Sequence, residues 1–309
     1  MAFLFRRFPS IIKRSVALLR KSDLLILASS TAFFATFSLA PIIIILLNVL
    51  SLVYFSSEDV SQKIYHAIQT VFDEKAAQSI EGIVNNFTSF KSHWWITVAG
   101  ALFLIFVATT LLHIVKQAIH QLWQIKRTSH KLKYSLRERL TSFALILVIG
   151  LLFIIAILSD ATMSVIKGYI HEVSPSELDV FLIQGLKVLI STMVVTAWFT
   201  VLFKVLQDAH VEWRVAIPGG IVTGVLFMLG EFILGKLLRY GNVATIFGTS
   251  ASIVLILLFI FYSSMIIYFG AAFTYEYANE IDRPIKPRKY ASLYEKKLVD
   301  VDDENEGEQ

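Results

Sequence analysis

Long stretches without Asp, Glu, Lys or Arg recur along this chain and set the pattern of its expected helices. Six of them approach or exceed the roughly 20 residues that a helix needs to cross a bilayer. Helices in the core of a soluble protein seldom stay apolar for that length. The pattern therefore predicts an all-α polytopic membrane protein with six transmembrane helices. These spans are expected at about residues 24–55, 94–115, 140–160, 180–203, 214–235 and 250–276.

The longest connection between the expected spans, residues 56–93, is itself patterned as two short helices. Ser56 can cap the first helix and Asp73 the second, and an apolar stripe follows each cap. These stripes either pack against the outer ends of the spans or form a cap over a cavity or a docking surface for another protein. We therefore expect a short helical insertion on the extracytoplasmic side.

Basic residues divide unequally between the two sides of these spans. Of the 28 Lys and Arg residues, 21 fall in the N-terminal segment, the second and fourth connections and the C-terminal tail. Positively charged connections stay in the cytoplasm, so both termini are expected there. The net charge of +4 therefore reports topology and does not by itself indicate a nucleic-acid partner.

The two ends of the chain differ in character from the membrane domain, which is expected at residues 23–280. Residues 1–22 are basic and amphipathic, and either lie on the cytoplasmic leaflet as a helix or serve as an ordinary positive anchor. Residues 281–309 form a cytoplasmic tail. Its end is acidic from Asp300 and is expected to be disordered.

The composition agrees with a membrane protein and narrows the chemistry. Hydrophobic residues make up 56% of the chain and charged residues 17%, and the mean hydropathy is +0.66. A typical soluble domain is about 45–50% apolar and about 25% charged, so a soluble enzyme is disfavoured. The absence of cysteine excludes disulfides, thiolate metal sites and cysteine nucleophiles.

Two of the apolar runs are longer than a bilayer requires, so they must tilt, kink or break. The first contains Pro41, which removes a helix hydrogen bond. The last opens with Gly241 and reaches Gly248 before its apolar part begins, which predicts a turn or a short re-entrant piece there.

Polar side chains within the spans suggest a binding site. Charges at membrane depth are costly and usually face a bundle interior or a cavity. The predicted directions of three spans place several such groups at one level in the outer half of the membrane. They could form an outward-facing polar cavity, with Lys187 and Glu231 as its central pair, or the cations could simply extend to the nearer surface. The candidate substrate-binding residues are Lys187, Glu231, Lys236, Arg239, Gln184 and Asp160.

Two polar groups near the cytoplasmic side allow competing interpretations. His113, Lys116 and His120 share one helix face and could contribute to a metal site, but no third ligand follows at a diagnostic spacing, so interfacial histidines are the favoured explanation. The basic stretch 126–139 could touch anionic lipid or RNA, but positive-inside topology already accounts for it. We therefore expect no metal, no cofactor and no nucleic-acid partner.

Several short stretches resemble motifs of one known family. Ser38-Leu39-Ala40-Pro41 in the first span is similar to an LS-x-P signature, and Trp123 with Lys126 resembles a W-x-x-K turn. Region 218–272 matches best, with a Gly-rich fifth span, a Lys, a Tyr and a Tyr-Gly-Ser-like turn in the same order. Across about residues 24–280, these motifs resemble the YihY/BrkB family of bacterial inner-membrane proteins.

The resemblance implies helix packing at Gly220 and Gly224 of the fifth span. It has departures, because Phe247 stands where the family usually has Tyr, Thr249 where it has Ser, and Ala272 where it has Glu. Any role that needs that carboxylate is therefore in doubt. The family was once labelled ribonuclease BN-like, and the seven histidines here form no nuclease-like metal cluster, so ribonuclease activity is not expected.

Together, these features lead to two functional hypotheses. The first is a transporter or translocation factor for a lipid or other amphiphile, acting through the outward-facing polar cavity. The alternative is a non-catalytic envelope-assembly scaffold that recruits a protein partner through residues 56–93. An intramembrane enzyme is disfavoured, because no paired catalytic groups are found. Membrane lipids are the expected partners in the first case and an envelope protein in the second, and the oligomeric state is left open.

Overall fold

The computed structural model describes residues 2–51, 78, 82, 94–128, 136, 139–148, 151–152, 177–240, 251–288 and 290–294. This part of the chain is mostly helical, as predicted. Its long helices are α1 (Ala2–Lys21), α2 (Leu24–Ser51), α5 (Trp94–Leu122), α7 (Glu177–Val205), α8 (Trp213–Tyr240) and α10 (Ala251–Glu280).

Four helical segments are long and apolar enough to cross a membrane: Leu102–Leu122, Val188–Val205, Trp213–Ile233 and Val254–Glu280. Two further apolar helical stretches within the described residues, Leu24–Ser38 and Arg139–Val148, are shorter. Large apolar side chains are exposed along these segments, as expected for surfaces that meet hydrocarbon rather than water. The described residues therefore have the character of a membrane protein.

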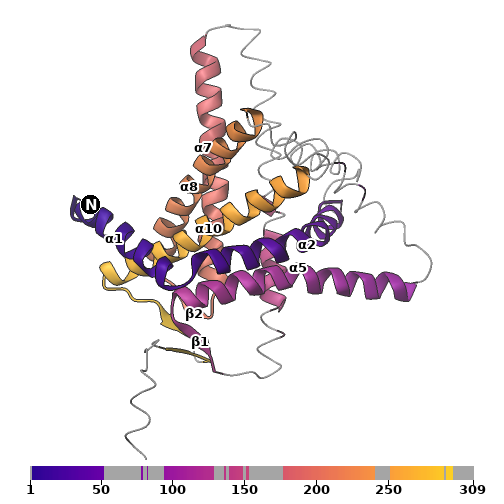
Figure 1. Cartoon of the computed structure of the whole chain (residues 1–309), viewed down its shortest axis with the longest axis horizontal. Helices are drawn as coiled ribbons and strands as arrows, with labels where there is room; N and C mark the ends of the chain where they lie inside the picture. Colours follow the sequence, from indigo (N-terminus) through magenta and orange to yellow (C-terminus); the bar gives the residue numbers. More distant parts are fainter. Residues whose placement is uncertain are drawn as a thin grey trace, which may run out of the picture.

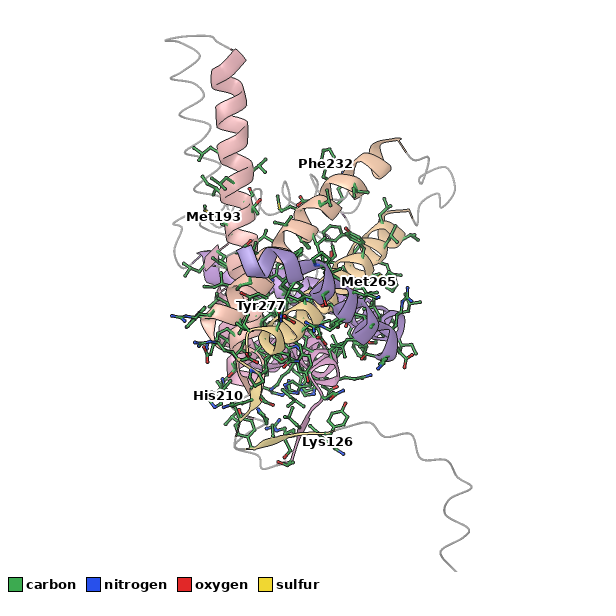
Figure 2. All side chains as sticks on the ribbon, turned by 90° about the vertical axis from the view of Figure 1, so that its left-hand side faces the viewer. Lys126, Met193, His210, Phe232, Met265 and Tyr277 are labelled. Atoms are coloured by element: carbon green, nitrogen blue, oxygen red, sulfur yellow. The ribbon has the colours of Figure 1, made fainter. Side chains whose placement is uncertain are left out.

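Five of the helices pack in the spatial order α7, α8, α10, α2 and α5. They converge at one end and spread apart towards the other, as Figure 1 shows. The converging end also carries α1 and the short strands. We call this end the junction and define it as residues 123–127, 206–212 and 281–294. Figure 2 shows Lys126 and His210 at the junction, with Met193 and Phe232 on the outer stretches of α7 and α8.

Small residues let α8 approach both of its neighbours closely. Gly220 lies against Thr200 of α7, and Gly224 lies against Thr196 one turn further along. Without a hydrophobic force between helices in lipid, such close approach supplies van der Waals contact that bulkier residues would prevent. The antiparallel pair α7–α8 is therefore held closely at its glycines, and Phe199 of α7 and Phe227 of α8 add a ring contact at 5.6 Å between centroids.

The contact between α8 and α10 is reciprocal. Gly219 of α8 faces Thr274 of α10, and Gly270 of α10 faces Thr223 of α8. Each threonine hydroxyl donates to the carbonyl oxygen four residues earlier in its own helix, at 2.7 Å for Thr223 and 2.6 Å for Thr274. Both hydroxyls are thus satisfied at a depth where an unpaired polar group would be costly.

Helix α2 joins α10 to α5. The hydroxyl groups of Thr31 and Tyr268 contact each other between α2 and α10. Ser38 Oγ donates to the carbonyl of Val107 on α5 at 3.2 Å. Helix α2 continues through Pro41, and this proline is buried, so it lies at a packing position within one helix. Gly241 and Gly248, the other expected breaks, lie outside the described residues.

Helix α1 turns back along the last turns of α10. Ile11, Ser15 and Leu19 form its buried stripe, and the partly exposed Phe8 lies 5.6 Å from the Phe273 ring of α10 between centroids. The guanidinium groups of Arg7 and Arg14 bind the Glu280 carboxylate. Arg14 Nε also lies 3.2 Å from Glu276 Oε2. The N-terminal helix is therefore tied to the end of the last long helix by apolar contact and charge.

Two small antiparallel sheets complete the junction and were not predicted from the sequence. Strand β1 (Ile125–Arg127) pairs with β4 (Ala291–Leu293), with Lys126 opposite Ser292. Strand β2 (Ala209–His210) pairs with β3 (Lys286–Pro287). Strands of two or three residues carry no readable periodicity, which explains why an all-α fold was expected. They fasten the beginning of the C-terminal tail to the connections that follow α5 and α7.

The close approach of α7 and α8 predicts the effect of Gly220→Ala. A Cβ at this position would lie 2.0 Å from Thr200 Oγ1 and 2.9 Å from backbone atoms of α7, so the helices must separate. Overpacking of this kind costs about 1–3 kcal/mol, which we expect to lower the midpoint of thermal unfolding in detergent by a few degrees. Gly185→Ala is the matched control, because no atom lies within 4 Å of its Cβ. Equal effects of the two substitutions would contradict the packing described here.

Candidate functional site

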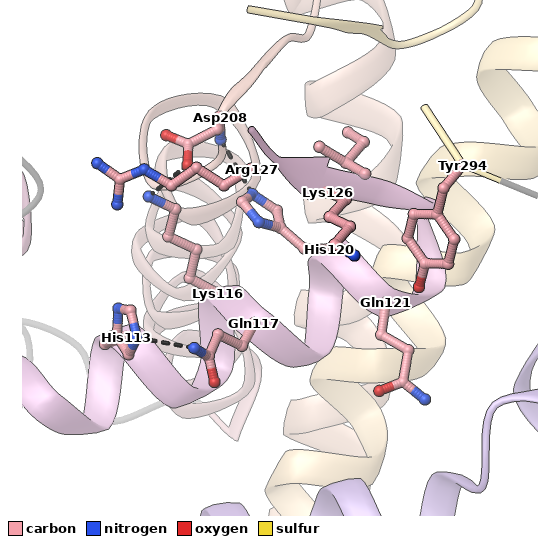
Figure 3. A pocket seen from close by; sticks show the side chains of 10 residues that line it. His113, Lys116, Gln117, His120, Gln121, Lys126, Arg127, Asp208 and Tyr294 are labelled. Carbon is pink, nitrogen blue, oxygen red and sulfur yellow. Dashed lines mark hydrogen bonds and ion pairs between the residues drawn. The ribbon is translucent and has the colours of Figure 1, made fainter. Parts of the chain in front are cut away.

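A polar pocket of about 700 Å³ opens at the junction (Figure 3). It lies between the last turns of α5, strand β1, the α7–α8 connection and Tyr294 in the first part of the tail. Positions 113, 116, 117, 120 and 121 recur at helical spacing on α5 and bring their side chains to one face. The pocket is lined by His113, Lys116, Gln117, His120, Gln121, Ile125, Lys126, Arg127, Asp208 and Tyr294.

Asp208 is the structural centre of this pocket. Its carboxylate Oδ2 lies 3.0 Å from Lys116 Nζ, and both residues are buried, at 6% and 4% exposed. Its other oxygen, Oδ1, accepts a hydrogen bond from the Tyr290 hydroxyl at 3.2 Å. Because a buried charge is tolerated only with an opposite charge and further hydrogen bonds, these contacts explain how the carboxylate remains there.

The backbone of Asp208 ties two further segments to the same point. Its amide N–H donates to Nε2 of His120 at 3.1 Å, and its carbonyl accepts the amide N–H of Arg288 at 2.9 Å. His120 therefore presents Nε2 as an acceptor, which corresponds to the neutral imidazole that carries its proton on Nδ1. One residue thus connects α5, the α7–α8 connection and the tail.

A left-handed backbone position shapes the wall of the pocket. Gln124 follows the last residue of α5 by two positions and has a φ of 55°. This conformation turns the chain directly into β1. Its carbonyl accepts the amide N–H of Tyr294 at 2.9 Å, which brings the tail against the pocket. The turn places Lys126 and Arg127 beside the polar face of α5, as Figure 3 shows.

The histidines of α5 do not gather metal ligands within the described residues. No group of three or more His, Asp or Glu side chains there is placed to hold a metal ion. His113 Nε2 instead lies 2.8 Å from Gln117 Nε2, and His120 is bonded to Asp208. Each histidine thus has a hydrogen-bond partner within the described residues.

A second hollow of about 870 Å³ is a groove with mostly apolar walls, formed by α1, α2, α8 and α10. Two of its described lining residues are charged, Arg20 and Asp23. Both belong to the turn between α1 and α2, residues 20–23, which we call the elbow, and Asp23 has a φ of 52° there. The groove is therefore amphipathic, with charge on one side and apolar walls elsewhere. Its other lining residues are Val16, Leu19, Leu24, Leu25, Ile26, Leu226, Tyr262, Met265, Ile266 and Phe269.

Tyr262 occupies its place in the groove wall because residue 230 is glycine. A Cβ on Gly230 would lie 1.8 Å from the Tyr262 hydroxyl oxygen and 2.1 Å from the ring, so the phenol group rests directly on the α8 backbone. Glu231 is the next residue along α8 and is half-buried. The groove therefore reaches the segment of α8 that carries the expected polar cavity.

The structure places the expected cavity residues on two helices. The contacts of Gly220 with Thr200 and of Gly224 with Thr196 run antiparallel. Continuing this register sets Glu231 level with about residue 189 of α7, two positions from Lys187. Helices α7 and α8 diverge towards these positions (Figure 2), so the shared level does not bring the two backbones into contact.

Most of the other predicted site residues are not described in detail. Lys187 and Gln184 lie on α7, and Lys236 and Arg239 lie on α8, but their side chains are outside the described residues. Asp160 is also outside the described residues, as is the expected insertion apart from residues 78 and 82.

Sequence reasoning missed the two hollows that the structure does describe. Asp208 lies 92 positions after Lys116, and no spacing rule links a carboxylate in one connection to a lysine on another helix. Arg20 and Asp23 looked like ordinary charges beside a span. The one available signal was the aspartate itself, an acidic residue in a short connection flanked by the apolar Leu206 and Ala209.

Comparison with known proteins gives one family and several relatives. The family described as Virulence factor BrkB matches residues 16–292. A UPF0761 membrane protein of Pseudomonas aeruginosa (strain LESB58) is 25% identical over 248 residues, covering 79% of this chain and 57% of that protein. One from Stenotrophomonas maltophilia (strain K279a) is 24% identical over 263 residues, covering 84% and 59%. The chain thus spans a little under three fifths of the length of these relatives, and no solved structure matches it.

The buried pair predicts a large effect of Lys116→Met on stability. Removing one partner leaves the Asp208 carboxylate buried without its counter-charge, which costs about 3–5 kcal/mol. We expect a clear fall in the midpoint of thermal unfolding, followed by tryptophan fluorescence in detergent. Adding Asp208→Asn should recover part of the loss, because the second change removes the uncompensated charge.

The control for this experiment is Arg283→Ala. Arg283 contacts the Glu212 carboxylate in an exposed pair, and such pairs contribute about 0–1 kcal/mol. If Lys116→Met were as mild as this control, Asp208 would not depend on the lysine.

Proposed function

This chain belongs to the Virulence factor BrkB family of membrane proteins, and from that premise we propose that it binds a membrane lipid or similar amphiphile and moves it across the bilayer. It does so without catalysing a covalent reaction. The amphipathic groove at the α1–α2 elbow carries this proposal, because its chemistry matches a ligand with one charged end and an apolar body.

The shape and lining of the groove support an acyl chain as its occupant. Leu226, Met265, Ile266 and Phe269 offer apolar contact from α8 and α10, where an acyl chain gains the same contacts as in the bilayer. Arg20 can donate hydrogen bonds to a phosphate or carboxylate headgroup, and its guanidinium suits planar, charge-assisted contacts. Asp23, on the same elbow, suits the ammonium of a zwitterionic headgroup.

The proposal includes a complete topology. Six transmembrane helices cross the bacterial inner membrane, and both termini lie in the cytoplasm. The two shorter apolar stretches, Leu24–Ser38 within α2 and Arg139–Val148, would be parts of the two remaining spans. Support comes from the junction, which brings the N-terminal helix, the connections that follow α5 and α7, and the beginning of the tail to one end of the molecule (Figure 1).

A route across the membrane leads from the groove towards the outer half of α8. Tyr262 separates the groove from Glu231, since its ring rests on the preceding Gly230. Glu231 and Lys187 then form the centre of the outward-facing polar cavity, and Lys236 and Arg239 lie beyond them. Along this route, the lipid headgroup passes from Arg20 to the outer cations Lys236 and Arg239. The acyl chains of the lipid remain in apolar surroundings.

Blocking the groove tests the proposal directly. Ile266 is buried and lines the groove, so Ile266→Trp should fill the space that an acyl chain would occupy. In proteoliposomes with fluorescent phospholipid, we expect wild-type protein to accelerate exchange between leaflets and this variant to slow it about tenfold, equivalent to about 1.4 kcal/mol.

Leu102→Trp is the matched control, because Leu102 is exposed on α5 and does not line the groove. It should exchange lipid at the wild-type rate. Wild-type protein that exchanges lipid no faster than protein-free vesicles would overturn the proposal. Recovery of a stable protein partner through residues 56–93 in that case would favour the scaffold alternative.

A further inference from the structure

We propose that the polar pocket at the junction is a second binding site, one that takes a phosphate group. The ligand is either the phosphate of a lipid headgroup or that of a small soluble molecule. This inference goes beyond lipid movement and does not depend on the apolar groove, because the two hollows have separate linings.

The net charge of the pocket favours an anion. Among the described lining residues, Lys116, Lys126 and Arg127 contribute three cations and Asp208 one carboxylate. Lys116 approaches that carboxylate at 3.0 Å, so the single negative charge is compensated within the wall. The lining as a whole therefore remains positive, and the low dielectric of a half-enclosed site strengthens its attraction for an anion.

The hydrogen-bonding groups of the pocket favour phosphate among anions. Arg127 offers a planar set of donors and Lys126 a compact ammonium, which together suit several oxygens of one phosphate. The hydroxyl of Tyr294 adds a neutral donor to the lining, whereas the amide nitrogens of Gln117 and Gln121 contact His113 and the Ser22 carbonyl. A tetrahedral group with three or more acceptor oxygens can use donors from several directions, whereas a carboxylate presents two oxygens in a plane.

The buried pair gives the pocket a fixed floor. Lys116 is 4% exposed although it lines the pocket, and Asp208 is held by the Tyr290 hydroxyl and by two backbone hydrogen bonds. A rigid floor limits the side-chain entropy that binding would otherwise cost. The more exposed Lys126 and Arg127, on β1, then stand at the open side of the pocket, where they can close on a ligand.

The test measures equilibrium binding of radiolabelled inorganic phosphate to full-length protein in nanodiscs of phosphatidylcholine. We expect saturable binding with one phosphate per chain. Combining Lys126→Gln with Arg127→Gln should weaken it at least about tenfold, because two charge-assisted contacts are lost. These changes leave the β1–β4 backbone pairing intact, and an unchanged unfolding midpoint would confirm that the variant is folded.

Lys13→Gln is the matched control, since Lys13 is an exposed lysine on α1 that does not line the pocket. It should bind phosphate like the wild type, and so should Ile266→Trp, which separates this site from the groove. Absence of saturable binding, or equal weakening by Lys13→Gln, would overturn the proposal even if lipid exchange were confirmed.

A second arm identifies the source of the phosphate group. Nanodiscs that also contain phosphatidic acid present the same group on a lipid. If the lipid phosphate reaches the pocket, inorganic phosphate binding should fall in these nanodiscs, and the double variant should abolish that competition. If inorganic phosphate binds equally in both nanodiscs, the site takes a soluble phosphorylated ligand.

Discussion

The ion pair between Lys116 and Asp208 holds together the end of the molecule at which the described helices converge. Two charges removed from water lose several kcal/mol of hydration each, and a single attraction between them does not reliably recover that loss. Here the carboxylate has the Tyr290 hydroxyl as a further donor, and the Asp208 backbone bonds to His120 and Arg288. Because these partners come from α5 and the tail, keeping the charge satisfied also keeps three separate segments in one arrangement.

Away from the junction, packing follows a different rule. In lipid, apolar side chains gain little by leaving one hydrocarbon surface for another, so helices associate where their backbones can approach closely. The glycines of α8 serve this purpose towards both α7 and α10, and the opposing threonines bond within their own helices. The contacts lie near the junction, and the helices diverge beyond them (Figure 1). Towards α10 the close contacts continue outward, because Tyr262 rests on Gly230 beside the groove, whereas α7 and α8 diverge with Lys187 and Glu231 on separate helices at about one level.

Sequence reasoning predicted the parts of this structure that have long-range periodicity. Apolar runs gave the membrane character and the helical fold, and motifs such as Trp123 with Lys126 gave the family. Trp123 is fully buried, and its indole N–H donates to the carbonyl of Ala271 at 2.8 Å, a contact that no spacing rule would reveal. The short strands and the Asp208 contacts were missed for the same reason, because they join residues far apart in sequence through single hydrogen bonds. The cavity expected around Lys187 and Glu231 stays a prediction, since most of its side chains lie outside the described residues.

Asp208 holds the tail against β1 through its contacts with Arg288 and Tyr290. Because the chain has no cysteine, the proximity of the tail to β1 can be measured with an introduced cysteine pair. Lys126→Cys and Ser292→Cys would place two thiols at directly paired positions of β1 and β4. The rate of disulfide formation under a mild oxidant, followed by mass spectrometry, should be high with Asp208 present and several-fold lower when Asp208→Asn is added. Equal rates with and without Asp208, or no disulfide between the paired positions, would contradict the account.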